Sequence, residues 1–253
     1  MKHLELKPIG LLVILGLVLS FACGGKITTR PTTPKYKFTV NGVVVKDLSL
    51  SKDIAYFTIL RDSVAFDSAV VKVGQNTLES HPGGIYSKKV SHLFDFGDTV
   101  TITVLSTKDS FSVNFNLFIP GSFHITDITN IADRTVHSQD KPRVLFTTSA
   151  NASGYFISVL KKNNTEGANG LNTLIPWEGI GGYTITGTTF RDVYDNYITG
   201  TYLIYLVAYN KSFLAYPDMK FQLPTGLPKE NISGANGTIG AGVVAAPDSI
   251  KAE

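Results

Sequence analysis

From Tyr36 onward, apolar and polar residues alternate with a period of two in most of the segments that are not turns. Successive side chains of a strand point to opposite faces of a sheet, so this pattern predicts strands with one buried and one exposed face. The clearest runs are 36–40, 100–104 and 111–117. Turn-forming residues separate such runs at Asn41-Gly42, Gly74-Gln75-Asn76, Pro82-Gly83-Gly84 and Gly97-Asp98. The sequence therefore predicts an all-β fold of antiparallel β-sandwiches.

Composition indicates a folded chain and argues against nucleic acid as a partner. Forty-three per cent of the 253 residues are apolar, which is enough for a sizeable hydrophobic core, and the single cysteine, Cys23, leaves no pair for an internal disulfide. The net charge of +3 is too small to predict binding to nucleic acid. We therefore expect domains held together by hydrophobic packing, with no nucleic-acid partner.

The amino-terminal residues have the layout of a bacterial lipoprotein signal. Lys2 and Lys7 precede an apolar run, and small residues lead to Cys23. The resemblance implies a diacylglycerol thioether on Cys23, cleavage before it and acylation of the new amino terminus. Ser20 stands where the family usually has leucine, so an ordinary signal peptide remains the alternative. The run 9–22 has 14 residues, short of the roughly 20 that span a bilayer.

Membrane attachment through Cys23 follows from this resemblance. Gly24 stands where an aspartate would resemble an inner-membrane retention signal, which favours the outer membrane. Several acyl chains on one cysteine would make the anchor stable, since a single chain binds only marginally.

We predict six segments along the chain. They are a signal peptide (1–22), a lipidated tether (23–34), an N-terminal β-sandwich (35–121), a connector (122–140), a second β-sandwich (141–224) and a Gly/Ala-rich C-terminal segment (225–253). In the last, Ile239 and Val243-Val244 predict an edge strand, with a loosely ordered terminus as the alternative. One short helix is expected in the second sandwich, because apolar residues recur at i, i+3, i+4 and i+7 from Phe190 to Tyr197.

The second sandwich resembles a fibronectin type III or immunoglobulin-like domain. In that family, a tyrosine opens the sixth strand and is followed at alternate positions by core residues. The matching residues here are Tyr202, Ile204, Leu206, Ala208 and Asn210. Phe146 takes the place of the usual core tryptophan. The resemblance implies that the ring of Tyr202 lies in the core and its hydroxyl bonds a backbone group.

The chain after its leader resembles a family of bacterial lipoproteins of uncharacterised activity, whose N-terminal unit is similar to carboxypeptidase-regulatory domains. The supporting stretches are 39–42, 65–74, 83–86, 97–104, 118–121 and 231–240. Members often accompany outer-membrane receptors and transporters. The resemblance implies an accessory protein at the membrane.

No motif predicts an enzyme, a cofactor or a metal site. His81 and His92 would meet across a hairpin, but no third ligand is marked. The run His137-Ser138-Gln139-Asp140 contains triad residue types, yet a triad is assembled from distant segments around an oxyanion hole. We interpret this run as a loop.

Aromatic residues are concentrated between Trp177 and Tyr216. Tyr205 and Tyr209 have the opposite strand phase to Tyr202. Together with Trp177 they predict a binding surface for a sugar or a protein. The alternative is that the helix-like segment covers this face, which makes both tyrosines a second core layer.

These observations predict a lipid-anchored, non-enzymatic accessory or adhesion protein at the bacterial outer membrane. A carbohydrate-binding lipoprotein that uses the Tyr-rich second domain is the alternative. The ligand or protein partner, the choice of membrane and leaflet and the oligomeric state stay open.

Overall fold

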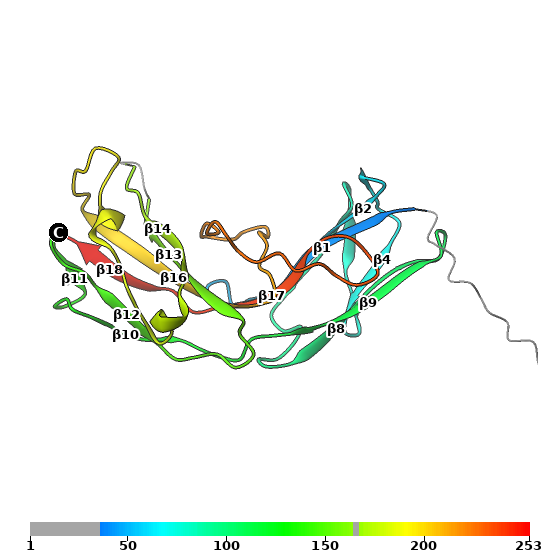
Figure 1. The fold of residues 1–253 in the computed structure, drawn as a ribbon, viewed down its shortest axis with the longest axis horizontal. Coiled ribbons are helices and arrows are strands. Elements are labelled where there is room, and N and C mark those ends of the chain that lie inside the picture. The colour runs from blue at the N-terminus through cyan, green and yellow to red at the C-terminus, as the bar shows by residue number, and fades with distance from the viewer. Residues whose placement is uncertain (1–35, 164–166) are drawn as a thin grey trace, which may run out of the picture. The chain divides into compact units, whose positions relative to one another are not determined.

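The computed structural model describes residues 36–163 and 167–253, which form β-strands joined by turns (Figure 1). There are eighteen strands and two short 3-10 helices, and no α-helix occurs in the described ranges. The all-β fold class is therefore confirmed. The signal peptide 1–22 and the tether 23–34 lie outside the described residues.

Nine strands form the first sandwich. They are β1 (Phe38–Asp47), β2 (Lys52–Arg61), β3 (Val64–Ala65), β4 (Val70–Val73), β5 (Asn76–Thr77), β6 (Glu79–His81), β7 (Ile85–Val90), β8 (Thr99–Ser106) and β9 (Phe111–Phe118). One sheet has the order β6-β7-β2-β1, with the short β3 paired to the end of β2, and the other has the order β5-β4-β8-β9. The alternating apolar residues bring the two sheets together. For example, the rings of Phe38 and Phe111 stack with centroids 3.9 Å apart.

Nine further strands follow. They are β10 (Ile125–Thr129), β11 (Thr135–Val136), β12 (Arg143–Phe146), β13 (Gly154–Lys161), β14 (Leu171–Ile175), β15 (Gly182–Thr184), β16 (Gly200–Asn210), β17 (Ile239–Val244) and β18 (Asp248–Ala252). The 3-10 helices are η1 (Trp177–Gly179) and η2 (Gly187–Phe190). Strands β10, β12 and β15 form one sheet of the second sandwich, and β14, β13, β16, β18 and β11 pair in the other.

The second sandwich has the tyrosine corner of immunoglobulin-like folds. The ring of Tyr202 is fully buried and packs edge-on against Phe190 at 5.0 Å. Its hydroxyl donates a 2.8 Å hydrogen bond to the carbonyl of Ile198, four residues upstream. Phe146 is also buried and lies 5.6 Å from the ring of Tyr155. The predicted immunoglobulin-like character of this sandwich is confirmed.

The C-terminal segment forms two strands of the largest sheet. Strand β17 pairs in parallel with β1 and antiparallel with the end of β16. Strand β18 pairs antiparallel with the beginning of β16. The expected edge strand is thus an interior strand, and it joins the pairing of the first sandwich to that of the second (Figure 1).

Glycines allow another segment to lie directly on β17. A Cβ at Gly240 would lie 1.6 Å from the carbonyl oxygen of Ser212, and a Cβ at Gly242 would lie 2.3 Å from the ring of Phe213. The Gly/Ala-rich composition of the tail therefore reflects close packing on a buried strand.

Residues 211–227, which we call the cover segment, lie on the opposite face of this sheet from the main core. Their aromatic rings pack on residues from both halves of the chain. The buried members of this second cluster are Val43, Val45, Ile54, Phe156, Tyr205, Val207, Tyr209, Phe213, Tyr216, Phe221 and Val244. The large sheet is therefore covered on both faces where β1, β17 and β16 are neighbours.

The short helix predicted from Phe190 to Tyr197 is wrong. Phe190 ends η2, and Arg191 pairs with Tyr197 in an isolated bridge. The carboxylate of Asp192 accepts hydrogen bonds from the backbone N–H groups of Tyr194 and Asn196, at 2.8 and 2.9 Å. An aspartate that bonds the backbone in this way favours a turn over a helix.

The segment 122–140 is also more than a connector. Strand β10 pairs with β12, and β11 pairs in parallel with β18, so both belong to the second sandwich. Their short length and few apolar residues left little strand pattern in the sequence.

Candidate functional site

Tyr205 and Tyr209 do not form the exposed binding surface that the sequence predicts. Tyr205 and Tyr209 are each 5% exposed, because the cover segment lies over them. The ring of Phe221 lies 5.3 Å from that of Tyr205. Burial raises the pKa of both tyrosines above the usual value. The core alternative is therefore correct, but the covering residues are 211–227 and not the helix-like segment.

Trp177 differs from these tyrosines in its exposure to solvent. It lies in η1 and is 82% exposed, whereas both tyrosines are buried. The structure therefore does not bring the three predicted residues together in one site. Cys23 lies outside the described residues.

The histidine and triad-like residues make local hydrogen bonds. His81 Nε2 lies 3.0 Å from the hydroxyl of Ser87. Asp140 accepts the backbone N–H of His137 at 2.7 Å, which closes a turn. Among the described residues, no group of three or more His, Cys, Asp or Glu is placed to hold a metal ion.

The most regular polar surface lies on the outer face of β8 and β9. Thr101 donates a 2.8 Å hydrogen bond to the side-chain oxygen of Asn116, and Thr103 donates one of 2.7 Å to Asn114. We call these four residues the Thr–Asn ladder. Each asparagine oxygen is used within the ladder, and its NH₂ group has no bond to another described residue. The ladder therefore presents uncharged donors to solvent.

An exposed aromatic ring stands at one end of this ladder. Phe118 is 46% exposed and is paired across the strands with Thr99. Its phase is that of the outward residues of β9, while Leu117 points into the core. An exposed ring beside hydroxyl and amide groups is suited to contact an uncharged, partly apolar ligand.

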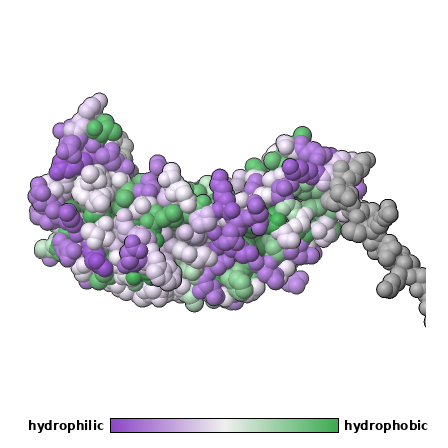
Figure 2. All heavy atoms as spheres, viewed as in Figure 1, coloured by the Kyte–Doolittle hydropathy of each residue, from purple (hydrophilic) through white to green (hydrophobic). Residues whose placement is uncertain are grey.

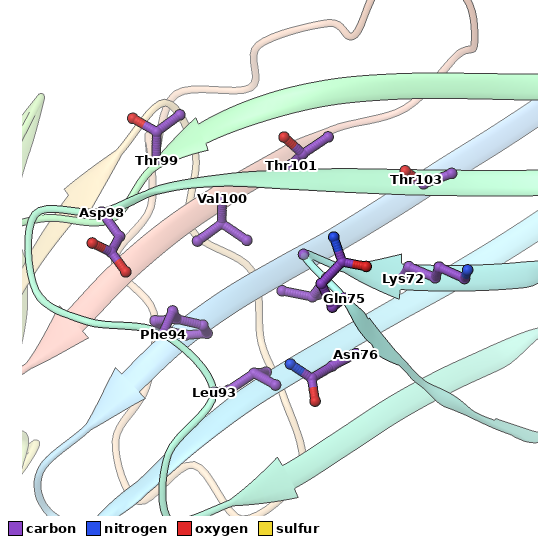
Figure 3. Close-up of a pocket in the computed structure, with 12 residues that line it drawn as sticks. Lys72, Gln75, Asn76, Leu93, Phe94, Asp98, Thr99, Val100, Thr101 and Thr103 are labelled. Atoms are coloured by element: carbon purple, nitrogen blue, oxygen red, sulfur yellow. The ribbon is translucent and has the colours of Figure 1, made fainter.

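A hollow of about 700 Å³ borders the same face, where β4 ends and β8 continues (Figure 3). Its lining residues are Lys72, Val73, Gly74, Gln75, Asn76, Leu93, Phe94, Asp98, Thr99, Val100, Thr101 and Thr103. Figure 3 shows Val100 pointing toward Phe94, while Thr99 and Thr101 point to the other side of the strand. Polar and apolar groups thus line one open depression.

A buried ion pair holds one of the loops that line this hollow. Lys46 and Asp53 face each other across β1 and β2, with Nζ 2.8 Å from Oδ1. The other carboxylate oxygen of Asp53 accepts the backbone N–H of Leu93 at 2.7 Å and that of Phe94 at 3.2 Å. Lys46 Nζ also lies 5.5 Å from the ring centroid of Phe94. The pair therefore positions the loop that lines the hollow.

The lining of the hollow favours binding over proton transfer. It contains one amine, on Lys72, and one carboxylate, on Asp98. Asp98 accepts the backbone N–H of Asp95 at 2.9 Å, so it also stabilises its own turn. On the face drawn in Figure 2, hydrophobic residues lie in small groups between hydrophilic ones.

The alternation at 100–104 and 111–117 predicts two strands but not the ladder between them. The signal for the ladder was the identity of the outward residues, which are threonine on one strand and asparagine on the next. Their pairing depends on the register of β8 on β9, in which Thr101 lies opposite Asn116. The sequence alone does not give that register.

Comparison with known proteins adds little to this description. No family model matches the chain, and no curated protein matches it. Among solved structures, it is similar to the fibronectin(III)-like modules of CbhA from Clostridium thermocellum, with 10% sequence identity and a TM-score of 0.26 over 85% of this chain and 92% of that one. No described helix is long and apolar enough to cross a membrane.

Proposed function

We propose that this chain is a lipid-anchored, non-enzymatic binding protein of the bacterial outer membrane, and that it presents the outer face of β8 and β9 to a partner. The observation that carries the proposal is the Thr–Asn ladder beside the hollow. These exposed, uncharged hydrogen-bonding groups are held in fixed register by the strands beneath them. The anchor rests on the lipoprotein-like sequence that ends at Cys23.

Attachment and binding are tested together in native membranes. Full-length protein and Cys23→Ala are compared for acyl labelling, membrane fractionation and crosslinked co-purification. We expect an acylated, membrane-bound protein that captures an outer-membrane protein, with all three properties lost in Cys23→Ala. Acyl label or membrane association that persists in Cys23→Ala would contradict the anchor.

The binding face is tested by removing one pair of the ladder. In Thr101→Ala/Asn116→Ala, both changes are on exposed side chains, so the fold is expected to be unaffected. The matched control is Thr184→Ala, an exposed threonine on β15 of the second sandwich. Loss of capture only in the ladder variant supports the proposal, and equal capture by both variants contradicts it.

A neutral glycan is a second candidate partner, favoured by the exposed ring of Phe118 next to Thr99. Sugars present hydroxyl groups and apolar C–H faces, which an amide–hydroxyl row and one aromatic ring can contact. A glycan array probed with the protein and with Phe118→Ser tests this. Silence of the wild-type protein across cell-wall and storage polysaccharides would remove this candidate.

A further inference from the structure

The free edge of β9 lies against a groove. Strand β9 is the last strand of its sheet, with β8 on its other side. A cavity of about 350 Å³ is lined by four consecutive residues of this strand, 114–117. Consecutive side chains of a strand point to opposite faces. A cavity that contacts all four therefore lies along the edge, where outward backbone N–H and C=O groups are found.

The sequence of this edge strand carries no residue that protects against pairing. Natural edge strands are kept apart by charges, prolines, bulges or short length. Strand β9 has eight residues without charge or proline, and it pairs with β8 through eight successive positions with no register shift. By contrast, the terminal strands β3, β5 and β11 have two residues, β6 and β15 have three, and β10 has an irregular register; β14 is uncharged and regular like β9 but has only five residues.

The far side of the groove is formed by another part of the chain. Its other lining residues are Lys211, Glu230, Asn231, Ile232, Ser233 and Ile239. A single extended segment would need only the space between β9 and this wall. The edge of a second copy would bring its own β8 and its opposite sheet into the place that the wall occupies, so a second copy fits poorly.

The charge of the groove also restricts the occupant. Lys211 and Glu230 contribute one positive and one negative group, and the remaining lining residues are uncharged. A polyanion would gain nothing from this balance. Backbone amides along a strand edge, with polar and apolar side chains alternating beside them, are suited to another polypeptide backbone.

We propose that this groove binds an extended segment of a partner protein, which adds to the sheet as a strand beside β9. The proposal builds on the proposed function by giving the partner a chemical class. Every second residue of β9 directs its N–H and C=O toward the groove, so main-chain hydrogen bonds would supply the affinity. Side chains of the partner would alternate between the two faces of the sheet.

The test uses the full-length protein in detergent and a displayed library of linear peptides of about twelve residues, long enough to span a typical strand. The library is first depleted on Ser233→Trp, whose indole would fill the groove from its exposed wall. We expect selected peptides to bind the wild-type protein at least about tenfold more tightly than Ser233→Trp. Proline placed in turn at two neighbouring central positions of the peptide should abolish binding at the position whose N–H faces β9, because it removes a backbone donor there.

Amide hydrogen exchange locates the bound peptide. Alternate amides of β9 should become protected when the peptide binds. The control is Trp177→Ser, altered at an exposed residue of the second sandwich, in which the peptide should protect the same amides as in the wild type. Asn231→Trp provides a second blocking variant if Ser233→Trp is poorly folded. Failure to select groove-dependent peptides, or peptides that leave β9 exchange unchanged, would overturn the proposal.

Sedimentation of the full-length protein in the same detergent examines the competing occupant. A dimer that Ser233→Trp dissociates would assign the groove to a second copy and overturn the peptide assignment. Because none of these measurements depends on acylation of Cys23, their failure is distinct from failure of the membrane anchor.

Discussion

The hydroxyl of Tyr216 donates a 2.6 Å hydrogen bond to the carboxylate of Asp47, which lies 169 positions earlier in the chain. The other oxygen of this carboxylate accepts the backbone N–H of Ser49. Asp47 thereby closes the β1–β2 turn and fastens the cover segment to it. Burial, together with the negative charge of Asp47, raises the pKa of Tyr216 well above its usual value.

Removing this hydroxyl should loosen the cover segment. Tyr216→Phe leaves one oxygen of a buried carboxylate without its donor, and hydrogen bonds to charged groups contribute about 1.5–3 kcal/mol. We expect the free energy of unfolding in urea to fall by that amount. Tyr194→Phe, altered at an 82% exposed ring, is the control and should match the wild type. Equal stability of both variants would show that the bond contributes nothing.

Asp53→Ala should destabilise the protein by about 3–5 kcal/mol, because it leaves Lys46 buried without its partner. It should also release the loop at the hollow, so the backbone amides of Leu93 and Phe94 should exchange faster. Asp218→Asn removes the charge that pairs with Lys89 in an exposed ion pair, keeps a residue suited to the left-handed backbone there, and should leave both quantities unchanged. Unaltered exchange at Leu93 in Asp53→Ala would argue against the role of Asp53 in holding this loop.

The tyrosine corner predicts a dependence on alkaline pH. Burial raises the pKa of Tyr202 to about 12, above its unfolded value of about 10. The folded protein thus keeps this proton in a pH range where the unfolded chain releases it. The stability due to Tyr202 is complete below pH 10 and is lost as the pH rises toward 12.

The Tyr202→Phe variant measures this effect. At pH 8 it should be less stable than the wild type by about 1 kcal/mol, the typical value of one hydrogen bond. Between pH 10 and pH 12 the difference between their urea midpoints should narrow, since phenylalanine does not titrate. A constant difference over that range would contradict the raised pKa.

Replacement by serine should destabilise the protein at buried aromatic residues and leave its stability unchanged at an exposed one. Tyr205→Ser and Tyr209→Ser each remove a ring from the second cluster, which should cost about 3 kcal/mol or more. Trp177→Ser changes an exposed side chain and should leave the melting temperature unchanged. Thermal unfolding of the three variants checks the comparison. A stable Tyr205→Ser protein would mean that the cover segment does not bury this face.

Gly240→Ala tests the close packing on β17. Its methyl group would overlap the carbonyl of Ser212, and overpacking of this kind costs about 1–3 kcal/mol. Gly187→Ala is the matched control, because a Cβ there meets no atom within 4 Å. Equal unfolding midpoints for the two variants would contradict the packing.

The features that the sequence predicted well depend on local pattern. Alternation located β1, β8 and β9, and the resemblance of the residues after Tyr202 to an immunoglobulin-like strand correctly implied both a buried ring and a hydroxyl bonded to the backbone. Each of these follows from which residues of one strand face the core. Such information is contained in a few consecutive positions.

The features that the sequence missed depend on contacts between distant segments. The glycines of 239–244 suggested a loosely ordered terminus. The need for glycine there depends on the packing of Ser212 and Phe213 on this strand, which the sequence does not show. Tyr205 and Tyr209 have the phase of an exposed face, and the cover segment that buries them has no regular pattern. The helical spacing at Phe190 was overridden by the side-chain bonds of Asp192.

The parallel pairing of β1 with β17 has a consequence for how this protein is made. Gly42 lies beside Ile239, so β1 cannot complete its pairing until β17, which comes almost 200 residues later, is present. Chains are synthesised from the amino terminus, and contacts of such long sequence separation form late and slowly. Most of the polypeptide must therefore be released from the ribosome before the native sheet forms.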